Sequence, residues 1–89
     1  MSEQDIEQFA TALARRYMQV KQEHSDACNK YNSHFRAEPF QADELQKSFF
    51  EQEAKYEQFQ LFNEVVATLP NDIHQVFSKE CERLSNKQE

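Results

Sequence analysis

The sequence predicts an all-α protein, and three observations support this prediction. None of the 89 residues is glycine, the residue that most readily adopts the positive φ angles of hairpin turns, bulges and phosphate-binding loops. The two prolines, Pro39 and Pro70, divide the chain into three segments. Each segment carries apolar residues at helical spacing, so we expect a long antiparallel helical hairpin followed by a short third helix.

The first segment is expected to form one helix over residues 3–36. Ser2 can cap its free amide groups, and Asp5 places negative charge in the first turn, where the helix dipole favours it. Polar residues between 25 and 34 lower the helix propensity, but the apolar stripe continues through them and favours a continuous helix. The stripe consists of Ile6, Phe9, Ala10, Leu13, Tyr17, Val20, His24, Ala27, Cys28, Tyr31 and Phe35.

The second segment is expected to form a helix over residues 41–69, because Pro39 disfavours α geometry at Glu38 and predicts a turn there. This helix is apolar on two sides. One side carries Leu45, Phe49, Tyr56, Phe59 and Val66. The other carries Phe50, Ala54, Leu61 and Val65, and Phe62 and Leu69 lie between the two. A helix with two apolar sides is expected to be covered twice.

The third segment is expected to form a helix over residues 72–84, followed by a polar tail at 85–89. Pro70 ends the preceding helix, and Asn71 and Asp72 supply a new cap and an acidic first turn. A helix this short is not stable alone in water, so it is expected to dock. Its apolar residues are Ile73, Val76, Phe77 and Leu84, with Cys81 at the edge.

A short turn near residue 39 makes the first two helices antiparallel neighbours. Counting from that turn pairs Tyr17 with Phe62 and Tyr31 with Phe49. The third helix can reach only the open end of the hairpin, near Ile6, Phe9, Val66 and Leu69. A seam around Phe50 therefore stays uncovered, and we expect the single domain, residues 1–89, to assemble into a dimeric helical bundle with coiled-coil-like packing.

Composition and charge limit the classes of function. Eight Phe and three Tyr indicate a folded chain despite few aliphatic residues. The net charge is −6, and it is uneven: residues 1–38 hold six acids against five bases, and residues 39–89 hold ten against five. A duplex-binding groove needs clustered Lys and Arg, so the sequence predicts no direct nucleic-acid binding. An acidic surface suits a basic protein partner.

The sequence predicts a cytoplasmic protein with no membrane partner. No apolar run approaches membrane-spanning length, and the polar, acidic amino terminus is unlike a signal peptide. The two cysteines, Cys28 and Cys81, are too few for a disulfide scaffold and are expected to be reduced.

His24 and Cys28 are the weak metal candidates, because an i, i+4 pair can place two ligands on one ion. The other two histidines lie too far along the chain to complete such a site. The favoured interpretation is a packed histidine, hydrogen-bonded across the hairpin to Gln52 or Glu53, beside a small apolar cysteine. No catalytic constellation is present, so neither enzymatic activity nor a cofactor is expected.

Polar residues on the second helix suggest two further roles. Gln52 and Asn63 fall on its inner face, where a buried amide can fix register or oligomer state; the alternative is that the apolar stripe is narrow and lets both side chains reach water. Glu53, Glu57 and Glu64 share one flank, which is expected to be a solvated face or an acidic contact for a basic partner.

The sequence therefore predicts a protein–protein interaction module that forms a homodimer and acts as a regulator, inhibitor or chaperone-like adaptor. Two alternatives stay open: a metal- or ligand-binding bundle using His24 and Cys28, and an acidic decoy that occupies a nucleic-acid-binding site on another protein. The predicted partner-binding residues are Phe50, Ala54, Leu61, Phe62, Val65, Glu53 and Glu57.

Overall fold

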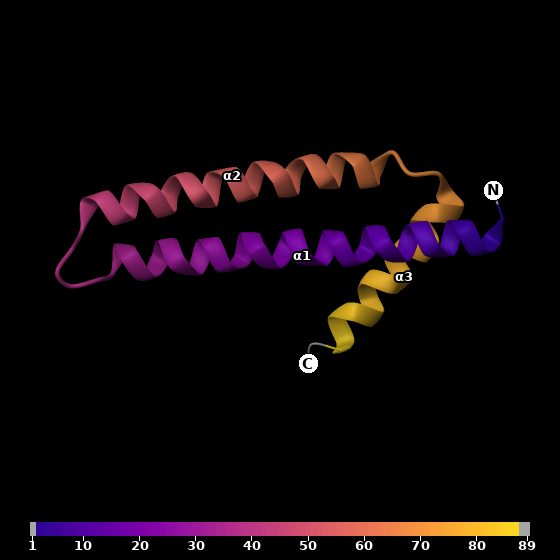
Figure 1. Cartoon of the computed structure of the whole chain (residues 1–89), viewed down its shortest axis with the longest axis horizontal. Helices are drawn as coiled ribbons and strands as arrows, with labels where there is room; N and C mark the ends of the chain where they lie inside the picture. The colour runs from indigo at the N-terminus through magenta and orange to yellow at the C-terminus, as the bar shows by residue number, and fades with distance from the viewer. Residues whose placement is uncertain (1, 88–89) are drawn as a thin grey trace. The chain divides into compact units, whose positions relative to one another are not determined.

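The computed structural model describes residues 2–87, and these residues form three α-helices and no strand (Figure 1). Helix α1 spans Glu3–Phe35, α2 spans Ala42–Ala67 and α3 spans Asn71–Lys87. α1 packs against both α2 and α3. The prediction of an all-α protein with three helices is confirmed.

Helix α1 is continuous through residues 25–34, although several of those residues are poor helix formers. Its first turn is capped as the sequence suggests: the backbone N–H of Asp5 donates to the Ser2 hydroxyl at 3.2 Å. The helix ends at Phe35, and residues 36–41 connect it to α2 with a cis peptide bond between Glu38 and Pro39.

Helix α2 ends at Ala67, two residues before the predicted limit. The backbone N–H of Thr68 donates to the Val65 carbonyl, and that of Leu69 donates to the Val66 carbonyl, both at 3.1 Å. These i to i−3 bonds satisfy carbonyl groups of the last turn, and they tighten the chain just before Pro70. Helix α2 therefore ends before the predicted limit.

Helix α3 extends to Lys87, three residues beyond the predicted limit. Residues 85–87, assigned from sequence to a polar tail, therefore continue the helix, because neither glycine nor proline interrupts them. Residues 88 and 89 of the predicted tail lie outside the described residues. At the other end, the Asp72 carboxylate accepts a hydrogen bond from the Ile73 N–H at 3.0 Å.

The chain forms two compact units. Unit 1 combines residues 1–19 with residues 62–89, and unit 2 comprises Val20–Leu61. Unit 1 thus contains part of α1, the end of α2 and all of α3, whereas unit 2 contains the rest of α1 and most of α2. The expectation of a single domain over residues 1–89 stays a prediction.

Unit 1 encloses an apolar cluster to which all three helices contribute. Its buried members are Ala10, Ala14, Val66, Ile73 and Phe77. Around them pack Ile6, Leu13, Tyr17, Phe62, Leu69, Val76, Cys81 and Leu84, which are partly buried. The ring of Tyr17 meets that of Phe62 edge-on at 5.5 Å, so this predicted cross-helix contact is confirmed.

Two positions of α1 in unit 1 differ from the predicted stripe. Ala14, which the stripe omitted, is fully buried, and Phe9, which the stripe included, is exposed. The reason is that α1 is covered by α3 as well as α2. The methyl side chains of Ala10 and Ala14 let the neighbouring backbone approach closely. The covered part of the α1 surface therefore includes Ala14 and excludes Phe9.

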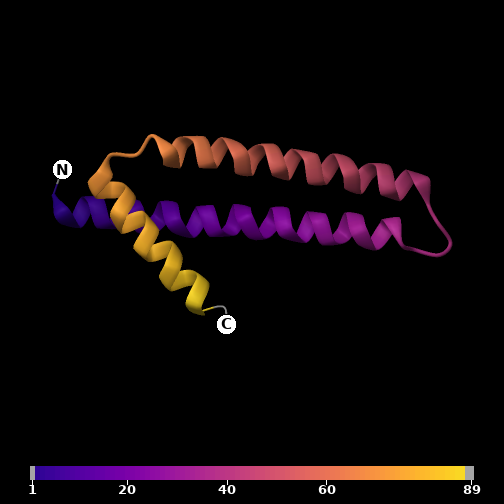
Figure 2. The same ribbon diagram turned by 180° about the vertical axis from the view of Figure 1, so that it is seen from behind.

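Unit 2 consists of two helical segments that lie side by side in both views (Figures 1 and 2). Its buried residues are Val20, Ala27 and Ser48. The predicted contact between Tyr31 and Phe49 is confirmed, with ring centroids 6.0 Å apart. Phe35, placed on the predicted stripe, is exposed because it is the last residue of α1 and has only the connecting loop beyond it.

Candidate functional site

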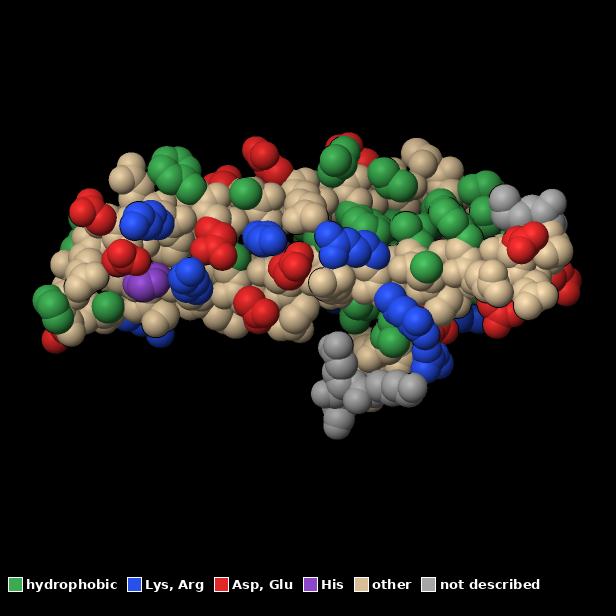
Figure 3. Space-filling view, viewed as in Figure 1, with side chains coloured by type: hydrophobic (Ala, Val, Ile, Leu, Met, Phe, Trp, Pro, Cys, Tyr) green, Lys and Arg blue, Asp and Glu red, His purple; other side chains and the backbone are tan. Residues whose placement is uncertain are grey.

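The side of α2 turned away from α1 in unit 2 carries exposed apolar residues at helical spacing. Phe50 is 61% exposed and Leu61 is 62% exposed, and Ala54 between them is exposed as well. Glu57 falls on the same line, because positions 50, 54, 57 and 61 are separated by four, three and four residues. We call Phe50, Ala54, Glu57 and Leu61 the outer strip. Figure 3 shows hydrophobic side chains on the surface of α2 with acidic side chains among them.

Phe49 widens the outer strip at one end. Its ring contacts Tyr31 of α1 and also meets the ring of Phe50 at 5.9 Å, while 42% of the residue stays exposed. A shallow hollow opens beside it, lined in part by Tyr31 and Leu45. The sequence placed Phe49 on the inner side alone, and it missed that this ring bridges the inner and outer sides of α2.

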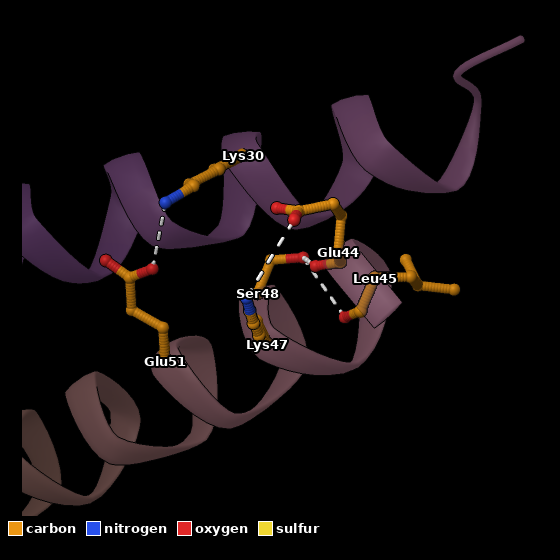
Figure 4. Close-up of polar contacts among 6 residues, drawn as sticks. All are labelled: Lys30, Glu44, Leu45, Lys47, Ser48 and Glu51. Atoms are coloured by element: carbon orange, nitrogen blue, oxygen red, sulfur yellow. Dashed lines mark hydrogen bonds and ion pairs between the residues drawn. The ribbon is translucent and has the colours of Figure 1, made fainter. Parts of the chain in front are cut away.

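Ion pairs occupy the flank of α2 that borders α1. Lys30 lies 3.1 Å from the carboxylate of Glu51 (Figure 4), and Lys55 lies 3.6 Å from that of Glu23. The second distance is too long for a hydrogen bond, so the buried Glu23 Oε2 keeps only its electrostatic attraction to Lys55.

Ser48 shows how the two helices of unit 2 approach each other. The residue is buried, and its hydroxyl lies 2.8 Å from the Glu44 carbonyl oxygen and 3.1 Å from that of Leu45 (Figure 4). A hydroxyl that donates to the preceding turn of its own helix needs no partner across the interface. A small, internally satisfied side chain therefore occupies a position where the two helices meet.

Two predicted partner-binding residues lie in unit 1. Phe62 is partly buried in the apolar cluster, where it contacts Tyr17, and so it is occupied within the chain. Val65 is 48% exposed. The remaining five belong to unit 2, where Glu53 and Glu57 are exposed beside Phe50, Ala54 and Leu61.

His24 pairs with its own helix and with aromatic rings. Its Nε2 lies 3.4 Å from the Cys28 Sγ, and its ring stacks on Phe59 at 5.9 Å and tilts against Tyr56 at 5.5 Å. The expected hydrogen bond to Gln52 or Glu53 is therefore wrong: aromatic side chains of α2 fill the space opposite His24. Within residues 2–87 no three His, Cys, Asp or Glu side chains converge in a way that could hold a metal ion.

The two amides predicted on the inner side of α2 differ in their hydrogen bonding. The Asn63 Oδ1 has a partner, because it accepts a hydrogen bond from the Tyr17 hydroxyl at 2.9 Å. Burial raises the pKa of Tyr17, and the neighbouring Cys81 adds to that rise. The Gln52 Oε1, in contrast, is buried without a hydrogen-bond partner among the described residues.

A second hollow lies in unit 1, between the first turns of α1 and the surface of α3. Ile6 and Val76 form part of its wall, and charged side chains of both signs form the rest. Arg83 is paired with Glu80, and this hydrogen-bonded contact raises the pKa of the arginine. The hollow thus lacks large exposed apolar side chains such as Phe50 and Leu61 of the outer strip.

Comparison with known protein families, with curated proteins and with solved structures found no match for this chain. None of the helices within residues 2–87 is both long enough and apolar enough to cross a membrane. The outer strip is the surface feature on which large apolar side chains are exposed on one side of a helix.

Proposed function

We propose that this protein is a protein–protein interaction module and that the outer strip of α2 is its contact surface. The observation that supports this proposal is the exposure of Phe50 and Leu61 on a helix whose opposite side already packs against α1. Clustered exposed apolar residues are typical of interaction sites, and aromatic anchors contribute most of the binding energy at such sites. A role as regulator, inhibitor or adaptor in the cytoplasm belongs to the same proposal.

The proposal includes the antiparallel hairpin that presents the strip. Contacts between α1 and α2 support it, because rising numbers on α1 meet falling numbers on α2: Glu23 lies near Lys55, whereas Lys30 lies near Glu51. A helical-bundle dimer, in which a second copy covers the strip, is one assembly of such a module. In the other possible assembly, a different protein covers the strip.

The first test is whether the outer strip contributes to the stability of the monomer. Phe50→Ser and Leu61→Ser should each change the free energy of unfolding by about 1 kcal/mol or less, because exposed side chains bury little on folding. Phe40→Ser is the matched control, since Phe40 is exposed in the connecting loop. Chemical denaturation followed by circular dichroism measures all three. At a protein concentration where sedimentation shows a monomer, a loss near the roughly 3–5 kcal/mol of a buried phenylalanine would show that the strip is covered within the monomer, and the proposal would fail.

The second test is the mass in solution at several concentrations, measured by sedimentation. If the strip binds a second copy, the mass should rise with concentration, and Phe50→Ser should abolish the rise while Phe40→Ser keeps it. The acidic-decoy alternative depends on carboxylates instead, so its binding should collapse with salt and be insensitive to Phe50→Ser. The metal alternative predicts a melting temperature that falls on addition of a chelator and is restored by zinc.

A further inference from the structure

A carboxylate interrupts the outer strip at its centre. Glu57 lies on one line with Phe50 before it and Leu61 after it, one to two turns away on each side. Glu53 lies one turn before Glu57 on the adjoining flank. Both are exposed, and within residues 2–87 neither forms an ion pair or a hydrogen bond from its carboxylate.

The lysines nearest in sequence to the strip are already engaged elsewhere. Lys55 pairs with Glu23 of α1, and Lys47 lies 3.9 Å from Glu44 one turn back on its own helix. Glu51, on the flank next to α1, is held by Lys30. Glu57 in the strip and Glu53 beside it are consequently the carboxylates that these lysines leave unneutralised.

Any helix that covers the strip must cover Glu57 as well. Burial of a carboxylate against an apolar surface is unfavourable unless a cation or hydrogen-bond donors compensate for the lost water. Phe50 and Leu61 favour an apolar occupant, whereas Glu57 requires positive charge between the apolar contacts. The strip is complementary to one pattern: apolar residues separated by a lysine or arginine.

On the basis of the proposed function, we propose that the occupant of the outer strip is an amphipathic helix of another protein that carries lysine or arginine between its apolar positions. The apolar residues pack against Phe50, Ala54 and Leu61. The cation pairs with Glu57, and a second cation one turn away on the adjoining edge pairs with Glu53. The ion pairs specify the register, and the apolar contacts supply most of the buried area.

A second copy of this chain fits the strip less well. An antiparallel pair that places Phe50 opposite Leu61 also places each Glu57 opposite Ala54 of the other copy. The two Glu57 positions are then offset by three residues, about 4.5 Å along the helix axis, with no cation between them. Like charges brought this close oppose association, and the net charge of −6 on each chain adds to the repulsion.

The test uses the full chain and two synthetic helical peptides. Both peptides carry leucine at positions complementary to Phe50, Ala54 and Leu61 and glutamine at the position facing Glu53, and they differ only in lysine or glutamate at the position facing Glu57. Fluorescence anisotropy should show binding of the lysine peptide at least about tenfold tighter than that of the glutamate peptide, and the difference should shrink with salt. Sedimentation of each peptide alone excludes peptide self-association as the cause.

Charge reversal on the protein provides the decisive comparison. Glu57→Lys should invert the preference, so that the glutamate peptide binds more tightly. Glu82→Lys is the matched control, because Glu82 is exposed on α3 in unit 1, and it should keep the preference of the unmodified chain. Phe50→Ser should weaken both peptides. Circular dichroism should show the same helicity in all variants, and Glu57→Gln, which should equalise the two peptides, provides a milder substitution.

The contrary outcomes separate this inference from the proposed function. Equal affinity for both peptides, no affinity for either, or an unchanged preference in Glu57→Lys would overturn the cationic helix. Concentration-dependent dimerisation that Phe50→Ser abolishes would identify the second copy as the occupant; the inference would then fail and the proposed function would stand. Both fail if the strip substitutions cost as much stability as a buried phenylalanine at a concentration where the chain is monomeric, since the strip would then be covered within the monomer.

Discussion

The two units of the molecule differ in the number of helical segments that cover one another. In unit 1, parts of all three helices enclose an apolar cluster, and Phe77 is only 5% exposed. In unit 2 two segments meet, and the outer side of α2 leaves Phe50 61% exposed. Both units contain phenylalanine at helical spacing. The different exposure of Phe77 and Phe50 therefore follows from how many segments cover each ring and not from the apolar content of the helices.

Two phenylalanine truncations test this difference between the units most directly. Phe77→Ala removes a buried ring that meets Tyr17 edge-on at 5.4 Å, and it should lower the free energy of unfolding by about 3–5 kcal/mol. Phe50→Ala should lower it by less than about 1 kcal/mol. Urea denaturation monitored by circular dichroism measures both. Similar losses for the two variants would contradict the difference between the units.

Enlarging an alanine tests the same difference from the opposite direction. Ala14→Leu adds volume where the residue is fully buried between helices, and overpacking should cost about 1–3 kcal/mol or more. Ala54→Leu is the matched change on the outer strip, and it should be nearly neutral because leucine and alanine have similar helix propensities. The measurement is again the free energy of unfolding. A destabilising Ala54→Leu would mean that the outer side of α2 is already filled.

The stability of unit 2 can be increased, because its interior contains an amide oxygen without a hydrogen-bond partner among the described residues. Gln52→Met should raise the free energy of unfolding by about 1 kcal/mol, since it removes the buried Oε1 that lacks a partner and keeps the shape of the side chain. Gln58→Met, at an exposed position of α2, should leave it unchanged. A destabilising Gln52→Met would show that water or another group satisfies the amide and that unit 2 is better packed than its contacts suggest.

The sequence was sufficient for the elements and for part of their pairing. Pro39 and Pro70 mark the breaks, Ser2 marks the first cap, and counting from the turn located two cross-helix ring contacts. These features depend on local geometry and on the helical period, both of which a single sequence contains.

The sequence could not predict how much of the surface of each helix is covered by its neighbours. Periodicity identifies the side of α1 that faces inward, but α3 also covers α1, and this adds Ala14 to the core and leaves Phe9 exposed. The predicted hydrogen-bond partner of His24 was wrong for a related reason. The ring of His24 stacks on Phe59, and this contact depends on side-chain packing between α1 and α2. The outer strip was predictable from the second apolar side of α2. Phe49 was assigned to the inner side alone because a period gives its position but not the reach of its ring.

The smallest expected effect concerns the hydroxyl of Tyr17, which belongs to the better-covered unit. Burial, with the neighbouring Cys81, raises the pKa of Tyr17 above its ordinary value of about 10. The folded state therefore holds the phenol proton more tightly than the unfolded state does. The resulting stabilisation is fully present below the unfolded-state pKa and is lost as the pH rises through the folded-state pKa.

Ultraviolet difference titration at the tyrosinate band measures the pKa of Tyr17. The part of the absorbance change that is present in the unmodified chain and absent in Tyr17→Phe belongs to Tyr17 alone. We expect that component to have a midpoint above about 10, with the free energy of unfolding falling over the same pH range. Tyr17→Phe should remove this fall, and it should lower stability at neutral pH because Asn63 loses the donor at 2.9 Å. A Tyr17 component at or below the ordinary value would mean that water reaches the hydroxyl, and the apolar cluster of unit 1 would then be as open on this side as unit 2 is at Phe50.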